Sequence, residues 1–178
     1  IIYNSFSGKK MLPEEEELKA TSFAIGKSLL KLGHHVQYFD MDDPDDIVEL
    51  CHSQLDAAFD TGERIHGDPR GEAYTAALLE FLNIPHTRTR SFHISLGINK
   101  VRIKLILMQN GISVPRFQVF PHNRVKLRSD LNFPLFVKGV ECENSIGIDE
   151  NSLVTDMEQL RKQVRKINEE YKQSALVE

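Results

Sequence analysis

Short strand-like segments alternate with helix-like segments through the first half of the chain, and this alternation constrains the fold more than any other feature of the sequence. Residues 1–4, 35–40 and 55–59 are apolar, β-branched or alternating, as strands are. Each of these strand-like segments is followed by a segment with a helix start, a helix end or helical spacing. These helical segments are residues 13–32, 45–53 and 70–82. Because such alternation is typical of a parallel sheet, we predict a small, doubly wound α/β domain over residues 1–92.

The pattern changes near residue 93, where two helical segments, residues 91–98 and 99–110, follow each other without a strand between them. Apolar side chains then recur at helical spacing over residues 152–169. Short strands are predicted at residues 114–120, 135–138, 146–148 and 175–177. We therefore predict a second, α+β unit over residues 93–178. Its pattern breaks off at the last residues, so we expect an incomplete domain from a longer protein.

Composition excludes several classes of function. The 22 Lys and Arg residues against 26 Asp and Glu residues give a net charge of -4, which argues against a nucleic-acid partner. Every apolar run is far shorter than the roughly 20 residues that a bilayer span requires, so we expect no membrane partner. Two cysteines and seven scattered histidines provide neither a disulfide framework nor metal-ligand spacing. We predict a cytoplasmic protein without a metal site of its own in these residues.

Two lysines are candidate phosphate ligands. Lys100 lies at a predicted helix start, and Lys138 ends the apolar strand that begins at Phe133. An ammonium group at the end of a rigid strand is well placed to contact a phosphate oxygen. The alternative is that both lysines are solvated surface charges, as most lysines are.

Two loops are further candidates. Residues 141–147 form a predicted turn in which Asn144, Ser145 and Gly147 could provide donors to a polyphosphate, although an ordinary hairpin is the alternative. Residues 62–72 follow a buried strand and precede a helix, which is where open α/β sheets bind ligands. In that loop we select a set of polar residues for a polar substrate, against the alternative of a solvated loop: Glu63, His66 and Arg70.

Five segments resemble, in the same order, motifs of the D-alanine–D-alanine ligase branch of the ATP-grasp superfamily. GEAYTAALLEFLNIPHT at residues 71–87 is similar to the family's helix that ends in LLE-x-L-G-IP-Y-T-G. NK at residues 99–100 with Lys104 is similar to DK-x-x-x-K, and GISVPRF at 111–117 to G-(I/L)-x-(V/T)-P-x-F. FPLFVK at 133–138 is similar to FP-(L/V)-(I/F)-VKP, and NSIGI at 144–148 to the end of EGSS-x-G-(I/V).

The resemblance implies a pre-ATP-grasp N-terminal domain followed by an incomplete ATP-grasp subdomain. It implies an enzyme of peptidoglycan biosynthesis that uses ATP and magnesium to phosphorylate a carboxylate and then joins it to an amine. Lys100 and Lys138 would contact ATP phosphates, Glu178 would hold the adenine amino group, and the loop of residues 62–72 would face an amino-acid substrate. The catalytic residues and magnesium ligands would follow Glu178, so these residues alone would be inactive. A homodimer is a further expectation.

Departures from the family pattern leave two alternatives open. Glu143 stands where the family's phosphate loop has glycine, and Arg88-Thr89-Arg90 stands in place of the family's G-S after the threonine. The segment of residues 5–16 also lacks the family's Glu-x-S pattern. The chain could therefore belong to an ATP-grasp ligase for another amino acid, or to a relative that binds nucleotide without catalysis.

Overall fold

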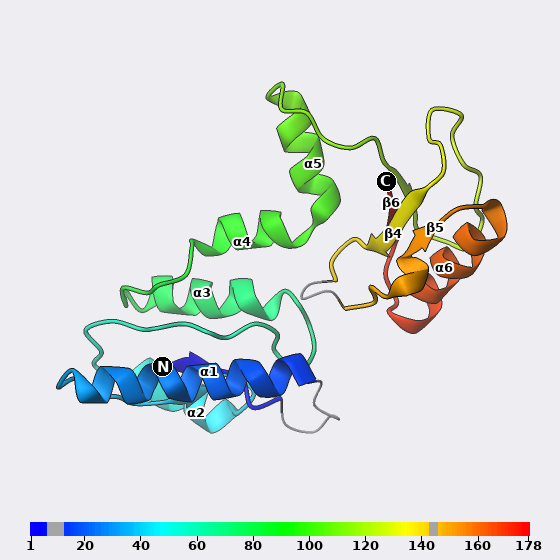
Figure 1. Ribbon diagram of the computed structural model, residues 1–178. Helices are drawn as coiled ribbons and strands as arrows, with labels where there is room; N and C mark the ends of the chain where they lie inside the picture. Colours follow the sequence, from blue (N-terminus) through cyan, green and yellow to red (C-terminus); the bar gives the residue numbers. More distant parts are fainter. Residues whose placement is uncertain (7–12, 143–145) are drawn as a thin grey trace. The chain divides into compact units, whose positions relative to one another are not determined.

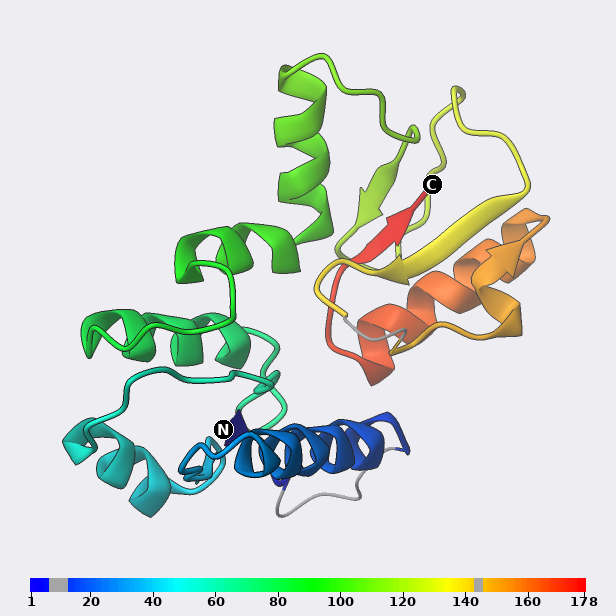
Figure 2. The same ribbon diagram turned by 60° about the vertical axis from the view of Figure 1, so that its left-hand side comes forward.

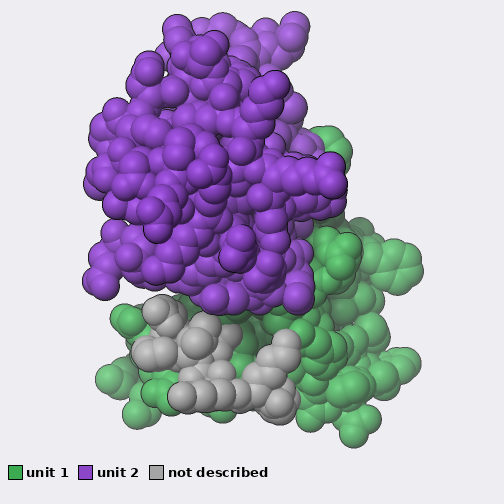
Figure 3. All heavy atoms as spheres, turned by 90° about the vertical axis from the view of Figure 1, so that its right-hand side faces the viewer, with its two compact units in different colours: residues 1–95 green, residues 96–178 purple. Residues whose placement is uncertain are grey.

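The computed structural model describes residues 1–6, 13–142 and 146–178 (Figure 1). They divide into two compact units, Ile1–Ser95 and Leu96–Glu178, which Figure 3 distinguishes by colour. Within these described ranges no helix combines the length and the apolar character needed to cross a membrane.

The first unit is built on parallel strand pairing. β1 (Ile2–Tyr3) pairs in parallel with β2 (Phe39–Asp40), with Ile2 opposite Phe39. Two single bridges continue the parallel pairing, from Ile2 to Asp60 and from Ala58 to His86. The predicted parallel sheet is therefore present, but residues 55–59 contribute only isolated bridges instead of the predicted strand.

Helices separate the parallel segments along the chain, namely α1 (Pro13–Lys31), α2 (Pro44–His52) and α3 (Gly71–Phe81). α4 (Ser91–Ile98) follows the last of these segments and continues from the first unit into the second. α2 begins where Asp43 accepts a hydrogen bond from the Asp45 N–H at 2.9 Å, and Pro44 occupies the first helical position. α3 begins at a glycine because a Cβ on Gly71 would lie 2.2 Å from the backbone nitrogen of Ile65.

The core of the first unit lies between its parallel segments and its helices. Each fully buried aliphatic side chain there contributes roughly 1.5–3 kcal/mol of hydrophobic free energy. The core residues are Ile2, Phe39, Met41, Leu50, Ala58, Leu79 and Ile84.

The second unit contains an antiparallel sheet. Its spatial order is β3 (Gln118–Phe120), β6 (Ala175–Val177), β4 (Leu135–Gly139) and β5 (Leu153–Val154). α5 (Lys100–Gln109) precedes the sheet along the chain, and a short 3₁₀ turn, η1 (Glu150–Ser152), precedes β5. α6 (Met157–Glu170) lies against one face of this sheet, as Figure 2 shows. The main buried residues between them are Phe120, Leu131, Leu135, Val137, Val154, Leu160, Val164, Ile167, Ala175 and Val177.

Two predicted elements of the second unit need correction. The predicted return strand at residues 146–148 is wrong, because residues 146–147 form a turn in which Gly147 has a φ of +78°. The strand that pairs with β4 is β5 instead, with Leu135 opposite Val154. The helix predicted from residue 152 begins at Met157, because Asp156 accepts hydrogen bonds from the first free N–H groups of α6. The mixed α/β fold is confirmed, while the doubly wound arrangement and the ATP-grasp subdomain stay predictions.

Candidate functional site

Glu178 is fixed by its backbone at the point where β6 ends. Its N–H donates to the carbonyl of Phe136 at 3.0 Å, and its own carbonyl accepts from the Phe136 N–H at 2.7 Å. These two bonds extend the pairing of β6 with β4 by one residue. The side chain of Glu178 is therefore placed by the sheet and not by a flexible loop.

Two lysines from different elements converge on the Glu178 carboxylate. Lys138 alternates with buried Val137 along β4, so it projects from the opposite face of the strand. Its Nζ donates to Oε1 of Glu178 at 2.5 Å. The Nζ of Lys104, on α5, lies 2.5 Å from Oε2 of the same carboxylate. We call Lys104, Lys138 and Glu178 the lysine cluster.

The lysine cluster is largely buried and carries a net positive charge. The exposed side-chain fractions are 12% for Lys104, 14% for Glu178 and 21% for Lys138. Burial raises the pKa of Glu178, but the two lysines outweigh burial, so that pKa lies below its ordinary value. Two ammonium groups and one carboxylate leave one positive charge uncompensated within the cluster. Such a group suits an anionic ligand, and lysine is a common ligand of phosphate oxygens in proteins.

Aromatic rings lie beside both lysines. The Nζ of Lys104 is 5.5 Å from the centre of the Phe117 ring, and the Nζ of Lys138 is 5.9 Å from that of Phe136. A ring face attracts a cation at this distance and excludes water from it. The rings therefore help to stabilise two positive charges that are largely buried.

Lys100 opens α5 and contacts the beginning of the predicted phosphate loop. Asn99 caps the helix by accepting from the Arg102 N–H at 3.0 Å, and its Nδ2 donates to Glu141 at 2.8 Å. Lys100 Nζ donates to the carbonyl of Cys142. The start of α5 is thus bonded to the residues that lead into the loop.

The loop itself is described only in part. Asn144 and Ser145, which we selected as phosphate donors, lie outside the described residues. Gly147 is described and has a left-handed backbone, and a Cβ there would lie 3.3 Å from the ring of Tyr171. Glycine at this position satisfies both the backbone conformation and the close approach to the ring.

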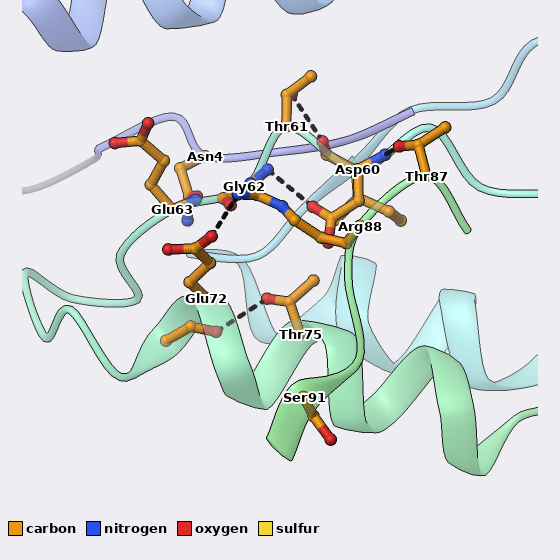
Figure 4. Close-up of polar contacts among 12 residues, drawn as sticks. Asn4, Asp60, Thr61, Gly62, Glu63, Glu72, Thr75, Thr87, Arg88 and Ser91 are labelled. Carbon is orange, nitrogen blue, oxygen red and sulfur yellow. Dashed lines mark hydrogen bonds and ion pairs between the residues drawn. The ribbon is translucent and has the colours of Figure 1, made fainter. Parts of the chain in front are cut away.

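A second group of polar residues lies in the first unit, at the carboxyl ends of its parallel segments (Figure 4). Arg88 donates to Glu72 Oε1 from Nη1 at 2.5 Å and to the carbonyl of Gly62 from Nη2. Its Nε lies 3.6 Å from Oδ2 of Asp60. We call Asp60, Glu72 and Arg88 the strand-end network.

Burial is the main influence on the pKa of both carboxylates in the strand-end network. The Asp60 side chain is fully buried, and that of Arg88 is 21% exposed. Burial raises the pKa of Asp60, and the charge of Arg88 opposes that rise. Burial likewise raises the pKa of Glu72, again against the charge of Arg88. Arg88 therefore compensates two buried carboxylates at once.

The three residues that we predicted as substrate contacts in the loop of residues 62–72 have other partners in the first unit. The Glu63 N–H donates to Asn4 Oδ1 at 2.8 Å, and the Glu63 side chain points away from Arg88 in Figure 4. The His66 N–H donates to Asp42 at 2.9 Å, while its side chain is 69% exposed. Arg70 forms an ion pair with Asp68 at 2.6 Å and is 64% exposed.

Asp60, Glu72 and Arg88 were not among the predicted site residues. Two signals could have identified them. Asp60 directly follows an apolar segment, where a strand ends, and Arg88 stands where the similar family motif has a small residue. For metals, the described ranges contain no group of three or more His, Cys, Asp or Glu residues that could hold an ion.

Comparison with known proteins links the chain to one family. No protein-family model matches the chain. The D-alanine–D-alanine ligase of Carboxydothermus hydrogenoformans is 30% identical over 169 residues, which cover 90% of this chain and 52% of that protein. The D-alanine–D-alanine ligase of Aquifex aeolicus is 29% identical over 151 residues, covering 83% of this chain and 49% of that protein.

Solved structures of such ligases have the same fold. The D-alanine–D-alanine ligase from Bacillus anthracis superposes with a TM-score of 0.75 at 20% identity, covering 99% of this chain and 55% of that one. The same ligase complexed with ATP gives a TM-score of 0.74 at 20% identity, covering 99% of this chain and 56% of the other. The chain thus spans about half the length of the relatives that it matches.

Proposed function

Because the chain belongs to the D-alanine–D-alanine ligase-like family of ATP-grasp proteins, we propose that it forms part of an ATP-dependent carboxylate–amine ligase. In the proposed reaction the γ-phosphoryl group of ATP moves to the carboxylate of one D-alanine, giving an acyl phosphate and ADP. The amino group of a second D-alanine then attacks the acyl carbon, phosphate leaves, and an amide bond forms. Such chemistry requires positive charge near the phosphates and exclusion of water from the acyl phosphate.

The lysine cluster is the observation that carries this proposal. It holds one uncompensated positive charge at the end of two paired strands, and a relative of the same fold has been solved with ATP. In the proposed complex Lys138 turns from Glu178 to a phosphate oxygen, and Lys100 contributes a second ammonium group. Glu178 then accepts a hydrogen bond from the amino group of adenine. Asn144, Ser145 and Gly147 complete the phosphate loop in this proposal.

Magnesium needs ligands that the described residues do not offer. The ion prefers an octahedral set of oxygen atoms, usually from carboxylates, waters and phosphates. The described ranges contain no acidic cluster that could supply such a set. We therefore assign no step to magnesium here, and the catalytic residues and metal ligands are expected after Glu178.

The amino-acid substrate is assigned to the first unit. The loop of residues 62–72 leaves the carboxyl end of a parallel segment, where α/β sheets bind ligands. Its backbone is held by Asn4 and Asp42, and Glu63, His66 and Arg70 are the candidate substrate contacts. A homodimer and a cytoplasmic location stay predictions.

A second candidate is the same reaction with a different amino acid. Arg88 supports it, because a buried guanidinium with two carboxylates occupies the strand ends where the family resemblance leads us to expect small residues. A third candidate, a relative that binds nucleotide without catalysis, rests on Glu143 in the phosphate loop.

Phosphate release by the full-length protein that contains these residues separates the candidates. The protein is incubated with ATP, magnesium and each of a panel of D- and L-amino acids. We expect release that depends on D-alanine. Release that depends on another amino acid favours the second candidate, and nucleotide binding without release on any member of the panel favours the third.

A further inference from the structure

Lys104 is the most buried member of the lysine cluster, and the proposed function gives it no role. Its side chain is 12% exposed, its Nζ lies 2.5 Å from Glu178 Oε2, and the ring of Phe117 lies beside it. Lys104 follows Lys100 by four residues on α5, so both side chains project from one face of that helix. The helix thus directs one lysine to Cys142 and the other to Glu178.

The charges of the cluster indicate what Lys104 does. Lys138 and Lys104 each neutralise a different oxygen of the Glu178 carboxylate. If Lys138 turns to a phosphate, Oε1 loses its ammonium partner while the side chain remains buried. A buried carboxylate without a partner is strongly unfavourable and would move or take up a proton. If the ammonium group of Lys104 stays in place, Glu178 keeps one partner and neither moves nor takes up a proton.

We propose that Lys104 is a positioning residue that keeps Glu178 ionised and aligned for the adenine amino group while Lys138 binds phosphate. This role rests on the proposed function, because it requires ATP at the lysine cluster. It predicts that Lys104 acts on recognition of the base through Glu178 and makes no contact with ATP itself. The ring of Phe117, whose centre lies 5.5 Å from the ammonium group, also holds that group by a cation–π contact.

Discrimination between two nucleotides tests this role. ATP has an amino group at position 6 of the base, which donates to a carboxylate, whereas inosine triphosphate has an oxygen there, which a carboxylate repels. The dissociation constants of both nucleotides are measured by calorimetry for the full-length wild-type protein and for Lys104→Met, Lys104→Gln and Lys104→Arg. Lys166→Met is the matched control, because it removes a lysine from an exposed pair with Asp149 in the same unit.

We expect the wild-type protein to prefer ATP, and Lys104→Met to lose roughly tenfold or more of that preference. Lys104→Arg should retain most of the preference, because it preserves the positive charge, and Lys166→Met should leave it unchanged. If Lys104→Met does not fold, as judged by circular dichroism, Lys104→Gln provides the same comparison with a smaller loss of polarity.

Two negative results can be told apart. A wild-type protein that prefers ATP, with an unchanged preference in folded Lys104→Met and Lys104→Gln, overturns the role of Lys104 and leaves the proposed function standing. A wild-type protein that binds neither nucleotide overturns the proposed function and the role of Lys104 with it. A merely structural role for Lys104 would lower the affinity for both nucleotides equally.

Discussion

Arg88 lies between two carboxylates at the strand ends of the first unit. It compensates Asp60, which is fully buried, and Glu72, which is 17% exposed. Removing one partner of a buried ion pair leaves an uncompensated charge, so Arg88→Met should lower the free energy of unfolding by about 3–5 kcal/mol at pH 7. Urea denaturation measures this change.

Arg90→Met is the matched control, because Arg90 is an exposed arginine two residues away. We expect its effect to stay within about 0.5 kcal/mol. Equal urea midpoints for Arg88→Met and the wild type would contradict the view that Arg88 compensates these carboxylates.

Lys138 is the residue on which the proposed phosphate contact depends. Lys138→Ala removes an ammonium group from the site and should weaken ATP use by about 1–3 kcal/mol. Steady-state kinetics of the full-length protein measure the loss as a rise in KM for ATP or a fall in kcat. Unchanged kinetics would mean that Lys138 only pairs with Glu178.

Glu178 should give the second unit a defined pH dependence. The two lysines outweigh burial and lower its pKa from the ordinary value of 4.5. A carboxyl group with a lowered pKa stabilises the folded state above its ordinary pKa, and this stability is lost as the pH falls through the folded value. Glu178→Gln should therefore be less stable than the wild type at pH 7, and the difference should shrink below about pH 4.5.

Denaturation of both proteins between pH 3 and pH 7 checks this sign. A difference that stays constant over the whole range would show that the carboxylate charge of Glu178 does not stabilise the fold.

At the scale of single elements, the start of α6 depends on its capping residue. Asp156 Oδ1 accepts from the N–H of Glu158 at 2.8 Å and from that of Gln159 at 2.9 Å. Asp156→Ala removes this acceptor and should lower the free energy of unfolding by about 0.5–2 kcal/mol. Asp156→Asn keeps an acceptor and should lose much less. Thermal denaturation of both variants separates the two outcomes, and equal losses would contradict a capping role.

The elements also show how far the sequence predicts the fold. The alternation of strand-like and helix-like segments correctly predicted parallel pairing in the first unit. The apolar stripe over residues 152–169 correctly predicted most of α6. The start of α6 was predicted too early, because Leu153 continues the stripe in sequence but lies 54% exposed in β5. Asp156 followed three residues later by Gln159 is a helix-start signal that could have corrected it.

The predicted strand at residues 146–148 failed for a different reason. Ile-Gly-Ile is apolar and β-branched, but Gly147 takes a left-handed backbone that a strand cannot contain. Asp149 then begins η1 through a capping box with Ser152. Backbone conformation at a glycine depends on what surrounds it, so the sequence pattern alone could not exclude the strand.

At the scale of the whole molecule, the candidate residues divide between the two units. The proposed nucleotide contacts belong to the second unit and the proposed substrate contacts to the first. Lys138 was predicted from its place at the end of an apolar strand and Glu178 from the family resemblance, although they are 40 residues apart. Arg88 was not predicted as a site residue, because its partner Gly62 is 26 residues away and no sequence pattern links the two. Pairs that form through the fold alone are therefore the part of a site that sequence patterns miss.

The chain spans about half the length of its relatives, so the proposed reaction is tested on the full-length protein that contains it. The most direct measurement is identification of the product by mass spectrometry after incubation with ATP, magnesium and isotope-labelled D-alanine. We expect labelled D-alanyl-D-alanine, with one ADP and one phosphate formed for each dipeptide. If the folded protein binds ATP but forms no dipeptide from D-alanine, the assignment as a D-alanine–D-alanine ligase is contradicted.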